Sequence, residues 1–581
     1  MFGKFSSLCI LINLSISSAF AQQLFPIIEQ EQLQLQEQRE AALQQQMQSA
    51  REVRFDIPPP QSTPSLPQDE TPCFPIEQVL LDGEEVDTFA FALHQTLTQT
   101  RFSPGMCLGS QGINSLISGV QNALIARGYT TTRVFADSQD LRSKVLTLIV
   151  VPGRIGAIRV DTEHKERTHA GRVAAFQNEI PAAAGDILNL RDLEQGLENY
   201  KRLPTVEADI QIIPGQQANQ SDVVVQWQQR EFPLRVSLGV DDAGSKATGK
   251  YQGTVTLAFD NPLGLSDLFY ASYTRELGHK DRFTDADGHT TSSGSNSYSF
   301  HYSAPFGDWT WSWHHSRYRY HQAVAGLSQN YDYNGISRTF EVGTQRLLYR
   351  DARRKTHLGG RLWQRSTHSF INDAEIGVQR RKTAGWALDL THKEYLGPAT
   401  LNLALSYKRG TGRADSLPAP EEAFGEGTSR MRILTADVGL NLPFSLGGQA
   451  FVYEGKIHSQ WNQTPLTSLD RLSIGNRYTV RGFDGEITLS GDRGWYWRND
   501  LAWQYLPAHQ LYLGVDTGHV SGQSARYLVG NSLTGGALGF RGQFQAGGAL
   551  YYDAFIGAPL HKPAQFPGKS PVFGFYFNYS F

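Results

Sequence analysis

The residue patterns that usually carry catalysis are absent from this sequence of 581 residues. It contains no His-Glu-x-x-His zinc pattern, no Gly-x-Ser-x-Gly nucleophile turn and no P-loop. The adjacent His314 and His315 lie in a segment of alternating aromatic residues, where an interfacial or loop role is favoured over metal binding. The sequence therefore predicts a protein that is not an enzyme and that needs no metal or cofactor.

Whether cysteines form disulfides depends on the compartment of the protein, and the first residues of the chain indicate that compartment. Residues 5–16 are mostly apolar, follow the single Lys4 and precede the small residues of Ala19-Phe20-Ala21. This pattern predicts a secretory signal peptide over residues 1–21. A permanent anchor is disfavoured, because the apolar run is about 12 residues long and a spanning helix needs about 20.

Two cysteines remain when the signal peptide is removed together with Cys9. They are Cys73 and Cys107, an even pair in an oxidising compartment. We expect a disulfide that ties the start of the first folded unit to its second helix. The alternative is two buried free thiols.

The charge and the composition exclude one class of protein and favour another. The net charge is −3, with 53 basic and 56 acidic residues interspersed along the chain, so there is no basic patch for nucleic acid. The mean hydropathy of −0.38 is that of a soluble protein. However, strands of a transmembrane barrel alternate apolar and polar residues, which hides their lipid-facing side from any average. The 56 Gly, 24 Tyr, 31 Phe and 10 Trp are typical of such a barrel with aromatic girdles.

Residues 231–581 have the two-residue period of β-strands throughout. The last segment alternates aromatic residues with Val572, Gly574, Asn578 and Ser580, and ends on Phe581. About 16 such segments occur, an even number as in single-chain bacterial barrels. The fold class is therefore a transmembrane β-barrel of antiparallel strands, since a soluble β-sandwich would not continue for this length.

The residues before the barrel divide into a helix, a linker and two similar units. Residues 22–50 are rich in Gln, Glu and Ala and predict one helix, which is long enough to plug a pore; a solvated, frayed helix is the alternative. Residues 51–73 are Pro-rich and form a semi-extended linker. Residues 74–153 and 154–230 each predict an α/β unit with the same order of strands and helices.

The most specific motif lies between the eleventh and twelfth predicted strands. Residues 466–490 are too long for a hairpin turn and hold Val480, Arg481, Gly482 and Phe483. A tip of this type resembles the signature of the Omp85 superfamily, in which the loop folds inward into the lumen. The two α/β units resemble POTRA domains, and a pair of them behind an N-terminal helix resembles the TpsB transporters of two-partner secretion. Two further segments are similar to that family, Asn261-Pro262-Leu263-Gly264 and Gly491-Asp492-Arg493-Gly494.

The resemblance also implies a partner for Arg481. The family places an Arg-to-Asp contact between the loop tip and an inner-wall strand. Asp516 alternates onto the strand face opposite Leu511, Leu513 and Val515, so it should point into the pore. A solvated lumen carboxylate is the alternative for Asp516.

The resemblance implies an outer-membrane transporter of a Gram-negative bacterium, with its POTRA domains in the periplasm. Those domains would bind one large TpsA-type exoprotein, such as a haemolysin, an adhesin or a contact-dependent growth-inhibition toxin, by strand addition. Export would need no nucleotide, because folding of the partner outside the cell can draw it outward. Outer-membrane lipid and the barrel-assembly machinery would be further partners, and we expect the terminal Phe581 to be the assembly signal.

Three other functions fit parts of the sequence. An assembly insertase of the same superfamily would be expected to carry more POTRA domains and no Gln-rich helix. An outer-membrane hydrolase would need clustered carboxylates or a Ser and His pair at the barrel rim. A simple porin would lack the periplasmic units.

Overall fold

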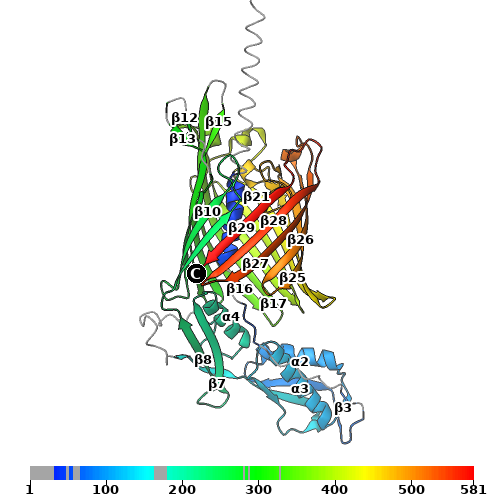
Figure 1. Ribbon diagram of the computed structural model, residues 1–581. Coiled ribbons are helices and arrows are strands. Elements are labelled where there is room, and N and C mark those ends of the chain that lie inside the picture. The colour runs from blue at the N-terminus through cyan, green and yellow to red at the C-terminus, as the bar shows by residue number, and fades with distance from the viewer. Residues whose placement is uncertain are drawn as a thin grey trace, which may run out of the picture.

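A computed structural model describes residues 32–47, 52–55, 66–67, 69–161, 179–278, 282–284, 288, 290–325 and 329–581. A large barrel stands above two smaller α/β units, and a helix lies inside the barrel (Figure 1). The predicted signal peptide, residues 1–21, lies outside the described residues. In the described part, no helix is long and apolar enough to cross a membrane.

Sixteen long antiparallel strands and the two-residue β18 close into the barrel, counted over the described residues. The predicted fold class is therefore confirmed. The strands in order are β9 Leu234–Asp241, β10 Gln252–Asp260, β11 Leu268–Glu276, β14 Gly294–Phe306, β15 Trp309–Ala325, β16 Asn330–Arg350, β17 Arg354–Ile371, β18 Ala374–Glu375, β19 Arg381–Leu396, β20 Ala399–Thr411, β21 Arg432–Leu446, β22 Gln449–Asn462, β25 Arg493–Leu506, β26 His509–Ser521, β27 Ser532–Gln545, β28 Ala549–His561 and β29 Val572–Ser580.

Each barrel strand has a lipid-facing and a lumen-facing side, because successive side chains point to opposite faces. On β26, Leu511, Leu513 and Val515 are 40%, 58% and 45% exposed. Tyr512 and Asp516, which alternate with them, are buried. The apolar face therefore meets lipid and the polar face lines the lumen, as in other transmembrane barrels.

The barrel closes where its first strand, β9, pairs with its last, β29. This register is short and runs only from Tyr576↔Asp241 to Ser580↔Ser237. The terminal Phe581 continues it, since its backbone N–H and C=O both bond to Val236 at 3.0 Å. The side chain of Phe581 is 55% exposed on the barrel.

The first α/β unit packs two helices on one side of a three-stranded sheet. Its elements are β1 Phe74–Ile76, β2 Gln78–Gly83, α2 Val86–Thr100, β3 Met106–Leu108, α3 Ser110–Ala126, β4 Arg133–Phe135, η1 Leu141–Ser143 and β5 Val145–Val151. The order across the sheet is β2-β5-β4, with β2 parallel to β5. Helix α3 ends at Ala126 and is followed by Gly128, whose φ of 102° favours glycine, and the N–H of Tyr129 bonds to Leu124 O at 3.0 Å.

The second α/β unit repeats this topology. Its elements are β6 Arg154–Asp161, α4 Leu190–Lys201, β7 Val206–Pro214 and β8 Gln220–Gln229. The order across the sheet is β6-β8-β7, with β6 parallel to β8, so the first and last strands of the two three-stranded sheets pair in the same way. The two units are therefore structural repeats.

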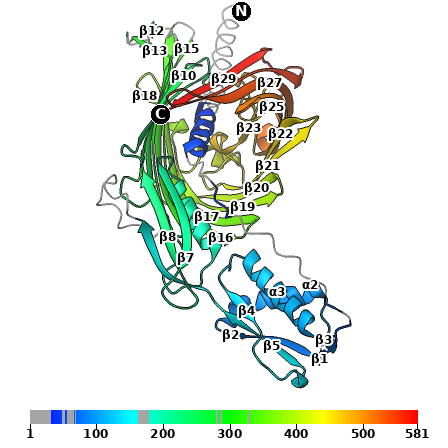
Figure 2. The same cartoon turned by 60° about the horizontal axis from the view of Figure 1, so that its bottom comes forward.

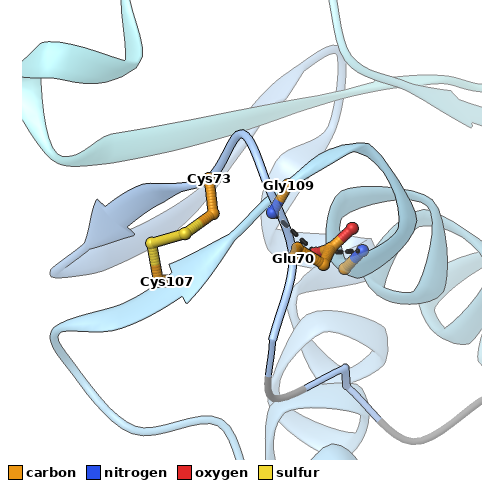
Figure 3. Close-up of a disulfide and its surroundings, with 5 residues drawn as sticks. Glu70, Cys73, Cys107 and Gly109 are labelled. Atoms are coloured by element: carbon orange, nitrogen blue, oxygen red, sulfur yellow. Dashed lines mark hydrogen bonds between the residues drawn. A yellow bond between two sulfur atoms is a disulfide. The ribbon is translucent and has the colours of Figure 1, made fainter.

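Cys73 and Cys107 form a disulfide in the first unit, with Cα atoms 5.3 Å apart (Figure 3). The expected link to the second helix is wrong in its detail, because Cys107 lies in β3 and α3 begins only at Ser110. Glu70 attaches the linker to that helix instead. Its carboxylate accepts the N–H groups of Gly109, Gln111 and Gly112 at 2.6–2.9 Å. Partial burial opposes the effect, but these three bonds hold the pKa of Glu70 below its usual value.

Candidate functional site: the barrel lumen

The N-terminal helix, residues 32–47, lies in the lumen (Figure 2). Its first residue, Gln32, bonds to Ser245 and Thr248 in the turn between β9 and β10. Its last described residue, Met47, belongs to the same buried apolar cluster as Tyr270 of β11. Of the two interpretations of this segment, the structure therefore shows the plug and not a solvated helix. Residues 22–31 and 48–50 of the predicted segment lie outside the described residues.

Most bonds between the N-terminal helix and its surroundings are neutral and involve glutamine. Gln36 donates to Ser297 of β14, and Tyr576 of β29 donates to Gln46. Three contacts carry charge, namely Arg39–Asp241 at 3.5 Å, Glu37–Arg365 at 3.0 Å and Glu40–His314 at 3.4 Å. The helix is thus held by many weak bonds spread along its length.

His314 was not identified as a functional residue by its sequence pattern. It faces the lumen from β15, where Nε2 lies 3.4 Å from Glu40 and Nδ1 lies 3.3 Å from the amide of Gln44. Strand alternation could have placed it there, because the neighbouring Trp313 faces lipid.

The second element in the lumen is the connection between β22 and β25, residues 463–492, which we call the inward loop. It contains η6 Ser468–Asp470 and a small hairpin of β23 Leu472–Ile474 with β24 Leu489–Gly491. At its base, Asp470 pairs with Arg365 of β17 at 2.8 Å. The predicted segment 466–490 lies within this connection.

The tip of the inward loop brings Arg481 and Asp516 together. Asp516 of β26 accepts Nε of Arg481 at 2.6 Å, Nη2 at 2.8 Å and the backbone N–H of Arg481 at 3.0 Å. Arg481 is 2% exposed and Asp516 is fully buried. A bidentate pair with a further backbone bond fixes both the position and the orientation of the tip.

A second carboxylate also contacts Arg481. Nη2 of Arg481 bonds to Asp500 of β25, which lies 3.7 Å from Arg541 of β27. The guanidinium of Arg481 is 5.6 Å from the ring centre of Tyr512. Sequence reasoning missed Asp500, although alternation along β25 places it on the face opposite Trp497 and Trp503.

Glycines on the inner wall allow the tip to approach the strands. A Cβ at Gly535 would lie 1.7 Å from Arg481 O, and a Cβ at Gly514 would lie 2.5 Å from Nη2 of Arg481. Gly482 has a φ of 95°, which favours glycine, and its Cα would lie 3.0 Å from a Cβ at Gly557. A glycine within a strand is a signal of such close backbone approach.

The apolar residues beside Arg481 enter a small core inside the barrel. Val480 is fully buried and Phe483 is 3% exposed. Phe483 packs edge-on against Phe566, with ring centres 5.8 Å apart. The cluster includes Ile474, Leu489, Tyr496, Val520 and Leu533. The four residues of the tip thus have distinct roles, with one ion pair, one close-approach glycine and two apolar anchors.

A cavity of about 700 Å³ separates the N-terminal helix from the inward loop and the barrel wall. Its lining includes Arg39 and Gln46 of the helix, Arg477 of the loop, and Asp553 and Tyr576 of the wall. Two bonds connect helix and loop directly, from Gln34 to Arg471 O and from Asn476 to Gln38. The helix is therefore not packed tightly against the loop.

The linker that follows the N-terminal helix is held at the periplasmic end of the barrel. The backbone N–H groups of Val53 and Phe55 donate to Glu198 and Glu194 of α4, each at 2.9 Å. Arg350 of β16 contacts both carboxylates, at 2.9 and 3.1 Å, and donates to Val53 O at 2.6 Å. Linker, second α/β unit and barrel thus meet at one buried ionic cluster, which we call the junction.

Family models match three parts of the chain. Residues 219–542 match the haemolysin secretion/activation proteins ShlB/FhaC/HecB, residues 74–153 match the ShlB-type POTRA domain, and residues 154–214 match a POTRA domain. These three matches follow the barrel and the two α/β units.

Whole proteins match over most of their length. The outer membrane transporter CdiB-2 of Burkholderia pseudomallei is 35% identical over 90% of this chain and 89% of its own. The haemolysin transporter ShlB of Serratia marcescens is 27% identical over 79% and 78%. Among solved structures, CdiB from Acinetobacter baumannii is 29% identical with a TM-score of 0.80, and the match covers 94% of this chain and 98% of that one.

Proposed function

This chain belongs to the ShlB/FhaC/HecB family of haemolysin secretion/activation proteins, and we propose that its lumen works as a fixed loop beside a removable plug during protein export. Like its relatives, it is an outer-membrane transporter of two-partner secretion, with its POTRA domains in the periplasm. It exports a partner exoprotein.

The observation that carries the proposal is the junction. The N-terminal helix closes the pore, and its linker is clamped between α4 of the second POTRA domain and Arg350 of the barrel. A partner segment that binds the POTRA domains and shifts α4 removes the acceptors of two linker N–H groups. Release of the linker then allows the helix to leave the lumen.

The exported partner is, in this proposal, a TpsA-type exoprotein of the contact-dependent growth-inhibition class. The match to CdiB-2 is 35% identical, whereas the two haemolysin transporters match at 26% and 27%. The partner enters unfolded, and an edge strand of a POTRA sheet, such as β7, offers unpaired backbone groups for strand addition. Backbone pairing gives affinity without a requirement for folded structure.

Export in this scheme uses no nucleotide. Folding of the exoprotein outside the cell makes each exported segment unable to return, so transport is driven by the free energy of folding. Reconstitution tests this directly. Full-length transporter in liposomes is given an unfolded N-terminal fragment of the exoprotein, and protection of the fragment from added protease is measured with ATP and after enzymatic removal of ATP.

We expect equal protection in both conditions. A variant with Glu198→Gln and Glu194→Gln weakens the linker clamp and substitutes no residue of the barrel wall, although it also removes the carboxylate partners of Arg350. It should raise the basal conductance of the pore in the absence of the fragment. Protection that depends on ATP contradicts the energetic part of the proposal, and an unchanged basal conductance contradicts the role of the junction.

A further inference from the structure

Among the arginines that face outward on the extracellular part of the barrel, four lie in two cross-strand pairs. Arg317 lies on β15, Arg338 on β16, Arg409 on β20 and Arg432 on β21. Arg338, Arg409 and Arg432 are exposed, and Arg317 is half-buried. We call this set the basic wall.

The neighbours of these residues establish that they point away from the lumen. Tyr318, next to Arg317, contacts Gln32 of the luminal helix. Lys408, next to Arg409, lies 3.6 Å from Asp470 of the inward loop. Since successive side chains of a strand point to opposite faces, Arg317 and Arg409 face the lipid side.

The same argument holds for the other two arginines. Ile433, next to Arg432, is buried in a luminal cluster with Leu466 of the inward loop. Arg338 shares its strand face with Phe340, which is 44% exposed on the lipid side. All four guanidinium groups therefore lie outside the barrel.

The basic wall contains two like-charge pairs across neighbouring strands. Arg317 is the direct register partner of Arg338, and Arg409 is the direct register partner of Arg432. Like charges directly opposite one another destabilise a sheet. Among the described residues, none of the four forms an ion pair with a carboxylate. Two such pairs, each without a counter-ion from the protein, require anions from the surroundings.

The height of the basic wall on the barrel indicates which anions are near. Below Arg432, the lipid-facing residues of β21 are apolar down to Phe444, and this span is 12 residues. Tilted strands of this length cover the apolar band of about 25 Å of such barrels. The arginines are thus at the outer edge of the hydrocarbon layer, at the depth of lipid headgroups.

The rim next to β21 differs in composition from the basic wall. At the extracellular ends of β22 and β25, the exposed lipid-facing residues are Trp461, Trp495 and Trp497, with only Arg493 as a cation. Aromatic residues are the ordinary girdle of a membrane interface. The paired arginines therefore differ from this part of the rim.

We propose that the basic wall binds the phosphate groups of the phosphorylated glycolipid that forms the outer leaflet of this membrane. A guanidinium donates two parallel N–H bonds to phosphate oxygens, and a phosphate between two arginines relieves the repulsion within each pair. The acyl chains of the same molecule lie against the apolar residues below. The site is thus a lipid-binding surface, separate from the lumen and from the exported partner.

Native mass spectrometry of the full chain in detergent tests the proposal. The protein is mixed with bisphosphorylated lipid A or with its dephosphorylated form, and retained molecules are counted. Variants are R317Q/R338Q, R409Q/R432Q and the four changes together. Arg493→Gln is the matched control, since it removes an outward cation of β25 whose register partner is Ser521 and not an arginine. Heat-modified mobility on gels verifies that each barrel is folded.

We expect the fourfold variant to retain about fivefold less bisphosphorylated lipid A, or less still, because each lost guanidinium–phosphate bond weakens binding. Arg493→Gln should bind like the unmodified protein, and arginine-to-lysine changes should restore part of the binding. Equal retention by the fourfold variant overturns the proposal. Equal binding of the dephosphorylated lipid overturns it too, and so does complete displacement by millimolar inorganic phosphate, which would assign the site to the free anion.

Discussion

The inward loop and the N-terminal helix share one lumen but are held there by different chemistry. The loop is fixed by the buried pair of Arg481 and Asp516, and its tip is close to glycines of the wall. The helix is held by neutral bonds such as that of Gln36 to Ser297, beside a cavity of about 700 Å³. Removal of one partner of a buried ion pair costs about 3–5 kcal/mol, whereas a neutral hydrogen bond contributes about 1 kcal/mol.

The difference separates a permanent part of the pore from a temporary one. A loop that is buried, charged and closely packed has one position. A helix with replaceable polar contacts can leave and return without disturbing the wall. Experiments that weaken each element in turn decide whether this division is correct.

The largest effect is expected for Arg481→Ala. Without the guanidinium, Asp516 and Asp500 are left as buried carboxylates without their shared cation, and the tip loses its position. Export of the partner should fall roughly tenfold or more, given the cost of breaking a buried pair. The amount of exoprotein in the medium measures this, with barrel assembly checked separately. Arg361→Ala is the matched control, a luminal arginine that pairs with Asp389 and not with the loop.

The partner variant sharpens this result. Asp516→Ala should reduce export less than Arg481→Ala does, because Asp500 still contacts the guanidinium. The double variant should be no worse than Arg481→Ala, as expected for coupled partners. Strictly additive losses would show that the two residues act separately. Wild-type export from Arg481→Ala cells would show that export does not need the fixed loop tip.

Deletion of residues 23–47 tests the temporary part. Without the luminal helix, single-channel conductance in planar bilayers should rise severalfold, because a helix of about 10 Å diameter no longer fills the lumen. The barrel should remain folded, since no wall strand is changed. Conductance equal to that of the full chain would show that the helix does not block the pore under these conditions.

A pair of small changes on the wall compares the two elements directly. Gly535→Ala places a methyl group against Arg481 O, so the loop tip must shift. Ser297→Ala removes one bond to Gln36 of the helix. We expect a severalfold loss of export for the glycine variant. The serine variant should lose almost none, because it removes one neutral hydrogen bond, which contributes about 1 kcal/mol or less to binding of the helix. Equal losses would contradict the distinction between loop and helix.

The first POTRA domain is stabilised by a covalent bond, whereas the inward loop is fixed by an ion pair. The disulfide of Cys73 and Cys107 closes a segment with a sequence separation of 34. Loss of a link of this length lowers the free energy of unfolding of the domain by about 3–4 kcal/mol. Chemical denaturation of the Cys73→Ala/Cys107→Ala protein measures this. Free thiols at both positions in mass spectra of the non-reduced wild-type protein would show that this disulfide does not form.

The smallest expected effect is a pH dependence at the junction. Burial, together with Asp308 and Asp186, raises the pKa of Asp192 on α4 from 3.8 to about 7, and Arg350 opposes this. The protonated form is favoured in the folded state, so its contribution is complete below pH 3.8 and is lost as the pH rises through about 7. Protease cleavage near α4 should therefore increase between pH 6 and pH 8. Asp192→Asn should abolish this change. If cleavage of that variant still increases with pH, another group is responsible for the pH dependence.

Much of the barrel could be predicted because its strands repeat a two-residue period against lipid. The same pattern also shows that residues 463–492 connect two strands of the barrel. For the N-terminal helix, the residues alone left the plug and a solvated helix as alternatives, since a glutamine-rich helix is equally polar in water and in a wet lumen. Cys107 was misplaced because β3 has three residues, too few to show any period.

The candidate site was predicted only in part, for a physical reason. The family resemblance pointed to Arg481 and Asp516, but the second carboxylate, Asp500, belongs to the neighbouring strand β25, and its contact with Arg481 depends on where the tip of the inward loop lies. The junction of Glu194, Glu198 and Arg350 joins residues about 150 positions apart, which no local pattern encodes. The inner-wall glycines Gly514, Gly535 and Gly557 were visible in the sequence, and their strand-interior position was the available signal.

The glutamines of the luminal helix have a consequence for how it moves. Gln32, Gln34, Gln36, Gln38, Gln44 and Gln46 all carry the same amide, which both donates and accepts. When the helix slides along the pore by one turn of about four residues, Gln36 and Gln38 arrive near the former positions of Gln32 and Gln34, where the polar wall offers them similar bonds. In the proposed withdrawal of the helix, many weak bonds spread along its length break. The glutamine side chains thus ease movement of the helix along the pore.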